Sequence, residues 1–194
     1  MKKIIILFLF LFSTSNIVKA VEGEYRMGVE FGYSWTTATT PLKPSQELAN
    51  QIGTLTHKND SHPFVGRIFS DYGITSDVSI EIGYFRTSPI DVTYTVSGVS
   101  STVSHDLNGF DLSGVVKDPR GFYGKVGMHT SKMNGPSQVT VGSATGTGLT
   151  TESDGTGVLL GVGYENNNIR YSFTHYGDVA DQTKLNMFSV GWMF

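Results

Sequence analysis

The sequence contains no cysteine, only six prolines and 16% charged residues. The absence of cysteine excludes disulfide scaffolds, thiol catalysis and cysteine-ligated zinc. Few prolines and no G-X-Y period exclude collagen and proline-rich disorder, although glycine is abundant at 23 of 194 residues. No apolar run reaches the roughly 20 residues that a membrane-spanning helix needs. With 39% hydrophobic residues, the chain can build one packed domain.

The first 20 residues have the pattern of a secretory signal peptide. Two lysines precede the apolar run at 4–12, and Val18-Lys19-Ala20 supplies the small residues of a cleavage site. We therefore predict a signal peptide at 1–20 and one mature domain at 21–194. Its removal lowers Lys+Arg from 14 to 11 against 17 Asp+Glu, so the formal charge changes from −3 to −6. An acidic exported domain is a poor partner for nucleic acid.

The mature chain alternates large apolar residues with small or charged ones. This period of two is typical of strands with two different faces. It recurs at 78–84, at 157–165 and in the last seven residues. In the first strand the large face is Met27, Val29, Phe31, Tyr33 and Trp35, and the other face is Arg26, Gly28, Glu30, Gly32 and Ser34.

The composition of the smaller face indicates which side is inside. A soluble sandwich would direct long polar side chains outward, but here that face is mostly glycine and serine with single charges. Small residues suit the tight interior of a small barrel, whose wide outer surface can carry aliphatic and aromatic side chains. We therefore expect the apolar face to contact lipid.

Eight such segments are present, which predicts an all-β fold: an eight-stranded antiparallel transmembrane β-barrel with up-and-down topology. Long connections at 38–62, 93–103 and 132–155, with a shorter one at 178–183, alternate with tight turns at 73–77, 118–121 and 165–168. Long extracellular loops and short periplasmic turns are typical of outer-membrane barrels. The expected strands are 25–37, 63–72, 78–92, 104–117, 122–131, 156–165, 169–177 and 184–194.

Three short stretches resemble the OmpA-like, opacity-type family of eight-stranded outer-membrane barrels. They are 65–84 with Ile80-Glu81-Ile82-Gly83-Tyr84, then 122–127, and then 161–171 with Gly161-Val162-Gly163-Tyr164-Glu165. The resemblance implies a lipid-embedded anchor whose interior charges pair with one another. It also implies that the last strand is an assembly signal, carried here by Trp192 and Phe194.

By parity along the strands, four basic and four acidic side chains point into the barrel. Buried charges persist only when they are paired and hydrogen-bonded, so we expect a charge network that fills the lumen. Aromatic residues at the strand ends are expected at the membrane interfaces. The interior set is Arg26, Glu30, Arg67, Glu81, Asp111, Lys125, Glu165 and Arg170, and the interface set is Tyr33, Trp35, Tyr84, Tyr164 and Trp192.

Three other functions are alternatives to an anchor. A small porin-like channel would use water-filled gaps along the interior charges. A soluble lipocalin-type barrel would need the aromatic face inside. His129-Thr130-Ser131 resembles the His-x-Ser of lipid A deacylases, but Lys132 stands where that family has Asn, and parity turns His129 inward. We therefore predict no enzyme, no catalytic residue and no cofactor.

A metal site is not predicted either. His57, Asp60 and His62 lie close together, but their spacing matches neither a zinc helix nor a calcium loop.

Any function beyond anchoring is expected in the loops. Val92, Tyr94 and Val96 alternate with threonines before Ser97-Gly98, as if a hairpin continued above the membrane. Such a ribbon would offer an exposed strand edge and an apolar row to a partner, or it would only cover its own barrel rim.

These features predict a protein of the Gram-negative outer membrane that serves envelope integrity or surface attachment. Its expected partners are outer-membrane lipid and lipopolysaccharide, the barrel assembly machinery with periplasmic chaperones, and a host-cell or other extracellular ligand.

Overall fold

The structure is a computed structural model of the chain, and it describes residues 23–38, 56–59, 62–96, 99–134, 138–141, 144–147, 152–180 and 183–194. The predicted signal peptide at 1–20 lies outside these residues. No helix in the described ranges is long and apolar enough to span a membrane.

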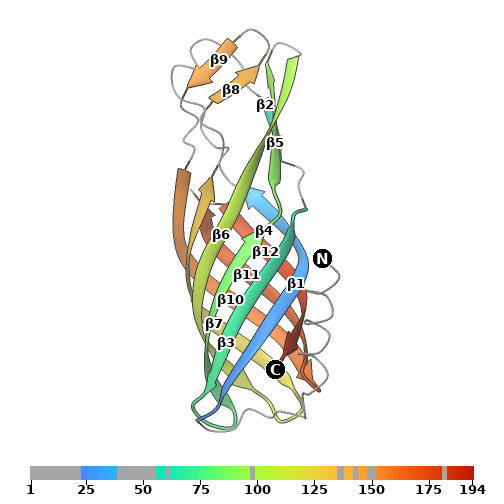
Figure 1. The fold of residues 1–194 in the computed structure, drawn as a ribbon, viewed down its shortest axis with the longest axis vertical. Helices are drawn as coiled ribbons and strands as arrows, with labels where there is room; N and C mark the ends of the chain where they lie inside the picture. The colour runs from blue at the N-terminus through green and yellow to red at the C-terminus, as the bar shows by residue number, and fades with distance from the viewer. Residues whose placement is uncertain are drawn as a thin grey trace, which may run out of the picture.

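Eight long strands form a closed antiparallel barrel, which confirms the predicted fold (Figure 1). Each strand pairs with the next one round the wall, and the first strand pairs with the last. In order round the barrel they are β1 (Tyr25–Ala38), β3 (Phe64–Gly73), β4 (Val78–Thr87), β6 (Val99–Lys117), β7 (Phe122–Asn134), β10 (Glu152–Asn166), β11 (Ile169–Ala180) and β12 (Thr183–Met193).

The closing seam joins β1 to β12 over eleven residue pairs, from Gly28 opposite Met193 to Ala38 opposite Thr183. The C-terminal residue extends this seam, because the Phe194 N–H donates to the Met27 carbonyl at 2.9 Å and the Met27 N–H donates back at 3.0 Å. A closed seam leaves no free edge in the wall, as a membrane-spanning sheet requires.

The short connections lie together at one end of the barrel and use residues suited to tight turns. Asn167 and Asn168 have φ of 48° and 68°, and Gly121 has φ of 97°. Asn and Gly tolerate this left-handed region. Gly121 also joins two neighbouring turns, since its N–H donates to the Asp118 carbonyl and its own carbonyl accepts from the Glu165 N–H, both at 2.8 Å.

Replacement of Gly121 by alanine is expected to destabilise the barrel. The new Cβ would lie 2.3 Å from the Glu165 carbonyl oxygen, in addition to the strain of a positive φ, together of order 1–3 kcal/mol. Gly23→Ala is the control, because Gly23 has φ of 83° but no atom lies within 4 Å of the place that an added Cβ would take. Urea unfolding in detergent micelles should show a clearly lower midpoint for Gly121→Ala than for Gly23→Ala; equal midpoints would contradict the expectation.

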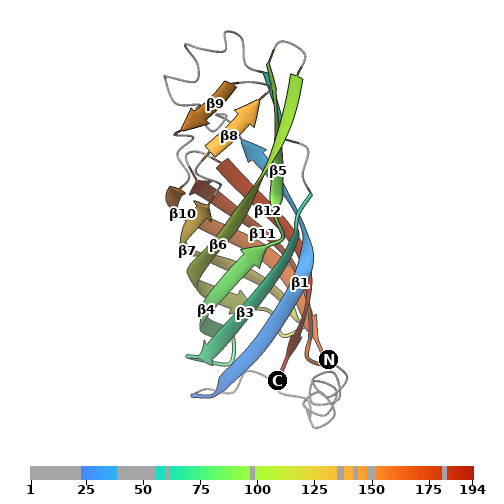
Figure 2. The same ribbon diagram turned by 45° about the horizontal axis from the view of Figure 1, so that its top comes forward.

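A β-ribbon rises above the barrel at the end opposite the short turns (Figures 1 and 2). It consists of β5 (Ile90–Val96), the first part of β6, and β2 (Thr56–Asn59), and we call it the β2–β5–β6 ribbon. The predicted single strand at 78–92 is wrong, because the strand stops at Thr87 and restarts at Ile90. Pro89 lies in this break, and a proline has no N–H for a ladder bond.

The predicted loops at 93–103 and 132–155 also contain regular structure. β6 pairs with β5 from Val99 onward, and β8 (Gln138–Val141) forms a two-stranded sheet with β9 (Ala144–Thr147). β8 contacts both β6 and β5, so this hairpin lies beside the ribbon.

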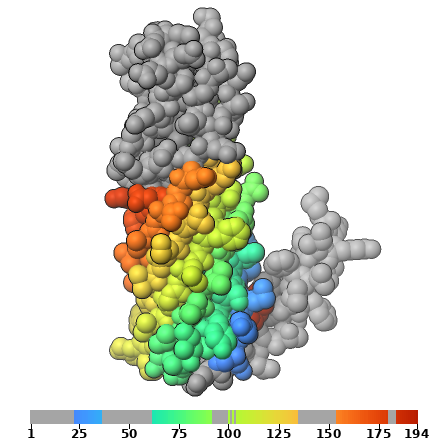
Figure 3. All heavy atoms as spheres, turned by 90° about the vertical axis from the view of Figure 1, so that its left-hand side faces the viewer, coloured from blue at the N-terminus to red at the C-terminus, as the bar shows by residue number. Residues whose placement is uncertain are grey.

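The outer wall of the barrel is apolar, and its large side chains point away from the centre. Phe31 is 53% exposed and Met128 is 62% exposed. Figure 3 shows one side of this wall, over the strands coloured green to orange. A soluble protein rarely exposes so continuous an apolar surface. The prediction that the large face points outward is confirmed, and a lipocalin-type core is excluded. Others on this face are Ile68, Ile82, Phe110, Leu112, Val126, Leu160, Val162, Phe188 and Val190.

Candidate functional site

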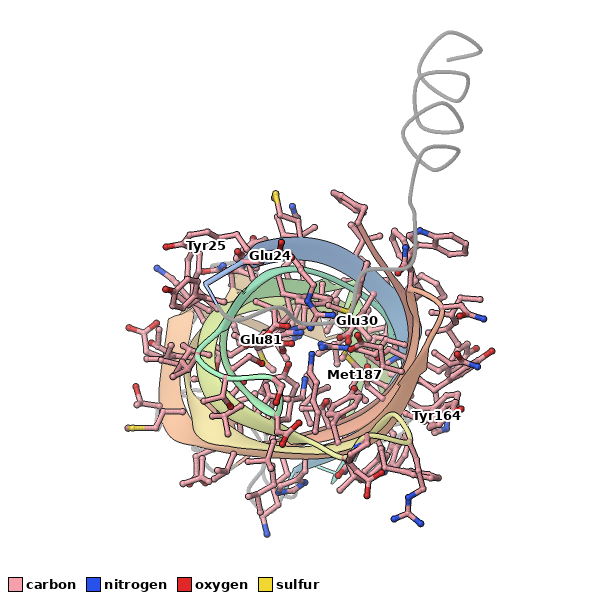
Figure 4. All side chains as sticks on the ribbon, turned by 90° about the horizontal axis from the view of Figure 1, so that it is seen from below. Glu24, Tyr25, Glu30, Glu81, Tyr164 and Met187 are labelled. Carbon is pink, nitrogen blue, oxygen red and sulfur yellow. The ribbon has the colours of Figure 1, made fainter. Side chains whose placement is uncertain are left out.

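All eight charged side chains predicted for the lumen point into the barrel. Seven are at most 4% exposed, and the Glu165 side chain, at 13%, lies toward the end with the short turns. Figure 4 views the barrel from that end, with Glu30 and Glu81 inside the ring of strands and Tyr25 and Tyr164 outside it.

Arg67 is the centre of the interior network. Its guanidinium lies 2.7 Å from Glu81 Oε1, 2.6 Å from Asp111 Oδ1 and 3.3 Å from Glu30 Oε2. All four side chains are buried, so these ion pairs are not weakened by water. The planar guanidinium offers five donors, which lets one cation serve three carboxylates from three strands.

Arg170 extends the network across the lumen. It pairs with Glu81, and it lies 3.2 Å from Glu165 Oε2. Its guanidinium also lies over the Phe69 ring at 4.5 Å and the Tyr123 ring at 4.8 Å. Such stacking stabilises a cation that has lost its water.

Two charged residues that sequence reasoning missed complete the network near the short turns. Asp71 pairs with Arg26, and Lys117 Nζ lies 3.1 Å from Asp71 Oδ2 and 3.5 Å from Glu165 Oε2. Both share the strand parity of residues already assigned inward, Arg67 and Asp111, so alternation alone could have found them. With them the described lumen holds five basic and five acidic side chains.

Inward glycines make room for the long charged side chains. Glu30 pairs across the sheet with Gly191, and Lys125 pairs with Gly161. A Cβ at Gly191 would lie 2.6 Å from Glu30 Cγ, and one at Gly161 would lie 2.6 Å from Lys125 Cε. A Cβ at Gly83 would lie 2.5 Å from the Arg67 guanidinium. The glycines on the inward face of the strands therefore leave the space that the charged side chains occupy.

The half of the lumen nearer the ribbon is mainly apolar, which the sequence reasoning did not anticipate. Phe85 and Tyr176 stack with ring centroids 4.7 Å apart, and the Tyr176 hydroxyl donates to Asp111 Oδ2 at 3.2 Å, joining the two halves. The expectation of an interior made of glycine, serine and charges was wrong for this half. The apolar cluster is Val65, Phe85, Ile90, Leu107, Met133, Leu159, Tyr176, Val179, Leu185 and Met187.

His129 and Ser131 lie at the edge of this apolar cluster and contact backbone carbonyls. His129 Nε2 lies 2.5 Å from the Gly177 carbonyl oxygen, and the Ser131 hydroxyl donates to the Val179 carbonyl. Both carbonyls belong to an irregularity in β11 between Tyr176 and Ala180. At 2% and 4% exposure, the two side chains face away from lipid, in the inward direction that parity indicates for His129.

The predicted interface aromatics lie on the outer wall. Tyr33 is 60% exposed and Trp35 is 38% exposed, whereas Tyr84, Tyr164 and Trp192 are half-buried. Two of the latter are partly covered by neighbouring rings: Tyr84 packs on Phe110 at 4.9 Å and Tyr164 on Phe122 at 5.0 Å.

The loop residues Val92, Tyr94 and Val96 occupy β5, and the backbone places them opposite β6. The other side of β5 pairs with β2, from Thr56 opposite Thr95 to Asn59 opposite Val92. The expected free edge at this part of β5 is therefore wrong, because a strand from the 38–62 loop occupies it.

Among the described residues, no group of three or more His, Asp or Glu side chains is arranged to hold a metal ion. Asp60 lies outside the described residues.

At the short-turn end, Asp118 forms a charged pair with Arg120. Its carboxylate accepts hydrogen bonds from the Arg120 backbone N–H at 2.7 Å and from Nε and Nη2 at 2.9 Å. These bonds lower the pKa of Asp118 to about 2 and raise the pKa of Arg120.

A closed barrel with an apolar outer wall and a paired-charge interior defines a transmembrane β-barrel protein. No family model matches the sequence, and no curated protein sequence matches it. The fold is similar to solved outer-membrane proteins. Ail, the attachment invasion locus protein of Yersinia pestis, is 13% identical with a TM-score of 0.45 over 90% of this chain and 100% of its own.

Two Pseudomonas aeruginosa proteins are similar to a comparable degree. OprG is 11% identical with a TM-score of 0.46, over 91% of this chain and 99% of its own. The N-terminal barrel domain of OprF is 14% identical with a TM-score of 0.43, over 89% of this chain and 100% of its own.

Proposed function

We propose that this protein is a sealed anchor in the outer membrane of a Gram-negative bacterium that presents the β2–β5–β6 ribbon as a surface for attachment to an extracellular ligand. The observation that carries the proposal is the ribbon itself. A hydrogen-bonded structure that continues beyond the barrel rim is larger than a connection between two membrane strands requires.

The filled lumen supports the role of an anchor. Ten paired charges occupy the half near the short turns, and an apolar cluster of ten buried side chains occupies the other half. An eight-stranded barrel is just wide enough for side chains to fill its interior. A lumen filled by side chains leaves little room for ions to pass, so we expect planar-bilayer recordings of the purified protein to show no discrete openings.

The ribbon is well suited to hold a fixed shape in solvent. β5 and β6 pair over seven residue pairs from Ile90–His105 to Val96–Val99, and β2 adds four more pairs on the outer side. Three strands are close to the minimum for a stable sheet in water. The two loops that supply them are thereby joined into one surface.

Replacement of residues 92–103 by an Asn-Gly turn is the test. Asp91 and Ser104 face each other at the base of the ribbon, and the Ser104 hydroxyl donates to Asp91 Oδ1 at 2.6 Å. A two-residue Asn-Gly turn suits such a hairpin. We expect the variant to fold and reach the cell surface, while cell attachment falls to the level of cells that lack the protein.

The control replaces residues 139–146, the β8–β9 hairpin, by the same turn and should retain attachment. Heat-modifiable migration in detergent verifies that each barrel is folded. Attachment that survives loss of the ribbon in a folded, surface-exposed protein would refute the adhesive role and favour a ribbon that only covers the rim.

The C-terminal strand and the buried His129 and Ser131 bear on barrel assembly and on catalysis. The Trp192–Phe194 end, held to β1 by the Met27 hydrogen bonds, is proposed as the signal for the assembly machinery. No enzymatic role is proposed, because the His129 and Ser131 side chains are buried and bound to carbonyls of β11.

A further inference from the structure

A groove of about 930 Å³ crosses the outer wall at the short-turn end. It is lined chiefly by Val116, Phe122, Gly124, Val162, Phe173 and Phe188. Gly124 points outward between Val116 of β6 and Val162 of β10. A Cβ at Gly124 would meet nothing closer than the Gly161 carbonyl oxygen at 4.0 Å, so the missing side chain leaves open space in the wall.

The position of the groove indicates what fills it. Gly124 is the third residue of β7, directly after the short turn that holds Asp118 and Arg120. The groove therefore lies in the leaflet nearest the short turns, and apolar surface at that depth is covered by acyl chains. In the proposed orientation this is the periplasmic leaflet, which consists of phospholipid.

The end of the groove carries one carboxylate, and that carboxylate pairs with an arginine outside the lining. Asp118 and Pro119 line it, and the Arg120 side chain that pairs with Asp118 is 79% exposed. Lys117 also lines the groove, but its ammonium is directed inward to Asp71 and Glu165. The net charge offered to a headgroup is therefore zero, which matches a zwitterion better than an anionic lipid.

Both members of the charged pair retain capacity for further hydrogen bonds. The Asp118 carboxylate accepts three hydrogen bonds from Arg120, whereas a carboxylate has about four acceptor sites. The exposed Arg120 guanidinium has donors beyond the two that it directs to Asp118. A primary ammonium could donate to the first group and a phosphate could accept from the second.

We propose that this groove binds one phospholipid with a primary-ammonium headgroup, such as phosphatidylethanolamine. One acyl chain lies across Gly124, the ammonium contacts Asp118 and the phosphate contacts Arg120. The proposal depends on the transmembrane fold and on the orientation of its ends, and not on the attachment role of the ribbon.

Native mass spectrometry of the purified, folded barrel in mixed micelles tests the site. The micelles contain equal amounts of phosphatidylethanolamine, phosphatidylcholine and phosphatidylglycerol. We expect one phosphatidylethanolamine to be retained in preference to the other two. Gly124→Leu, which places a side chain in the open space where the acyl chain is proposed to lie, should abolish retention. Gly66→Leu should not, because Gly66 faces outward on β3 and an added Cβ would contact only the Phe31 ring, at 3.8 Å.

Asp118→Asn provides a second test that leaves the groove open, because it removes the carboxylate proposed to contact the ammonium. It should remove the preference for phosphatidylethanolamine, and it decides the matter alone if Gly124→Leu does not fold. Equal retention of all three lipids by the wild-type barrel would overturn the proposal, as would unchanged retention in folded Gly124→Leu. Either result with a folded barrel leaves the attachment proposal intact, since that is tested by loss of the ribbon.

Discussion

Replacement of Arg67 by methionine should destabilise the barrel more than any other single change at its charged residues. The substitution leaves Glu30, Glu81 and Asp111 without the cation that lies within 3.3 Å of all three. Breaking a buried ion pair by removing one partner costs about 3–5 kcal/mol. Urea unfolding of the protein in lipid vesicles, followed by tryptophan fluorescence, measures the loss.

Arg86→Met is the matched control. Arg86 pairs with Asp106 at 3.6 Å on the outside, where the two side chains are 62% and 46% exposed. Exposed pairs contribute about 0–1 kcal/mol. The double variant Arg67→Met/Asp111→Asn should recover part of the loss, because it removes one unpaired carboxylate. Equal unfolding midpoints for Arg67→Met and Arg86→Met would show that the network does not stabilise the barrel.

Phe85→Ala should have a comparable effect in the other half of the lumen. Phe85 is fully buried; its ring stacks on Tyr176 and lies so close to Gly109 that a Cβ there would be 2.7 Å from it. Truncation of a buried phenylalanine costs about 3–5 kcal/mol through lost contacts and the cavity that remains. The same urea titration provides the measurement.

Phe110→Ala is the control for Phe85→Ala. It distinguishes the effect of lost interior packing from the effect of removing an aromatic side chain anywhere in the barrel. Phe110 is 59% exposed on the outer wall, and lipid chains can occupy the space that its ring leaves. The main loss is its stacking on Tyr84, a kind of contact worth about 0.5–1.5 kcal/mol. If Phe110→Ala destabilised the barrel as much as Phe85→Ala, the apolar cluster would not be a packed core.

The alternation of residues predicted the barrel because a strand in lipid has two sharply different faces. Met27 to Trp35 on one face and Arg26 to Ser34 on the other leave little choice of orientation, and the tight turns with Gly121 and Asn168 mark one end. The inward direction of Asp71 and Lys117 followed from the same alternation, but they were overlooked because each stands at the end of its strand.

Other features could not be predicted from alternation. Inward-facing apolar residues such as Leu107 and Leu185 follow the same period as the charged ones, and only the three-dimensional position shows that they gather in one half. The pairing of β2 with β5 joins residues far apart in the chain, and no local pattern identifies a partner strand. Pro89 indicates a break in the strand, but the apolar residues on both sides of it favoured one continuous strand.

The described lumen holds equal numbers of acidic and basic groups, so its net charge is zero. Because the interior contributes no net charge, the net charge of the described side chains lies outside the lumen, where seven of them are acidic and four are basic. Substitutions in the solvent-facing segments can therefore change the electrostatic repulsion from another negatively charged surface while the barrel stays neutral inside. Added salt weakens that repulsion beyond about 8 Å at physiological ionic strength, so approach to such a surface should depend on ionic strength while the fold does not.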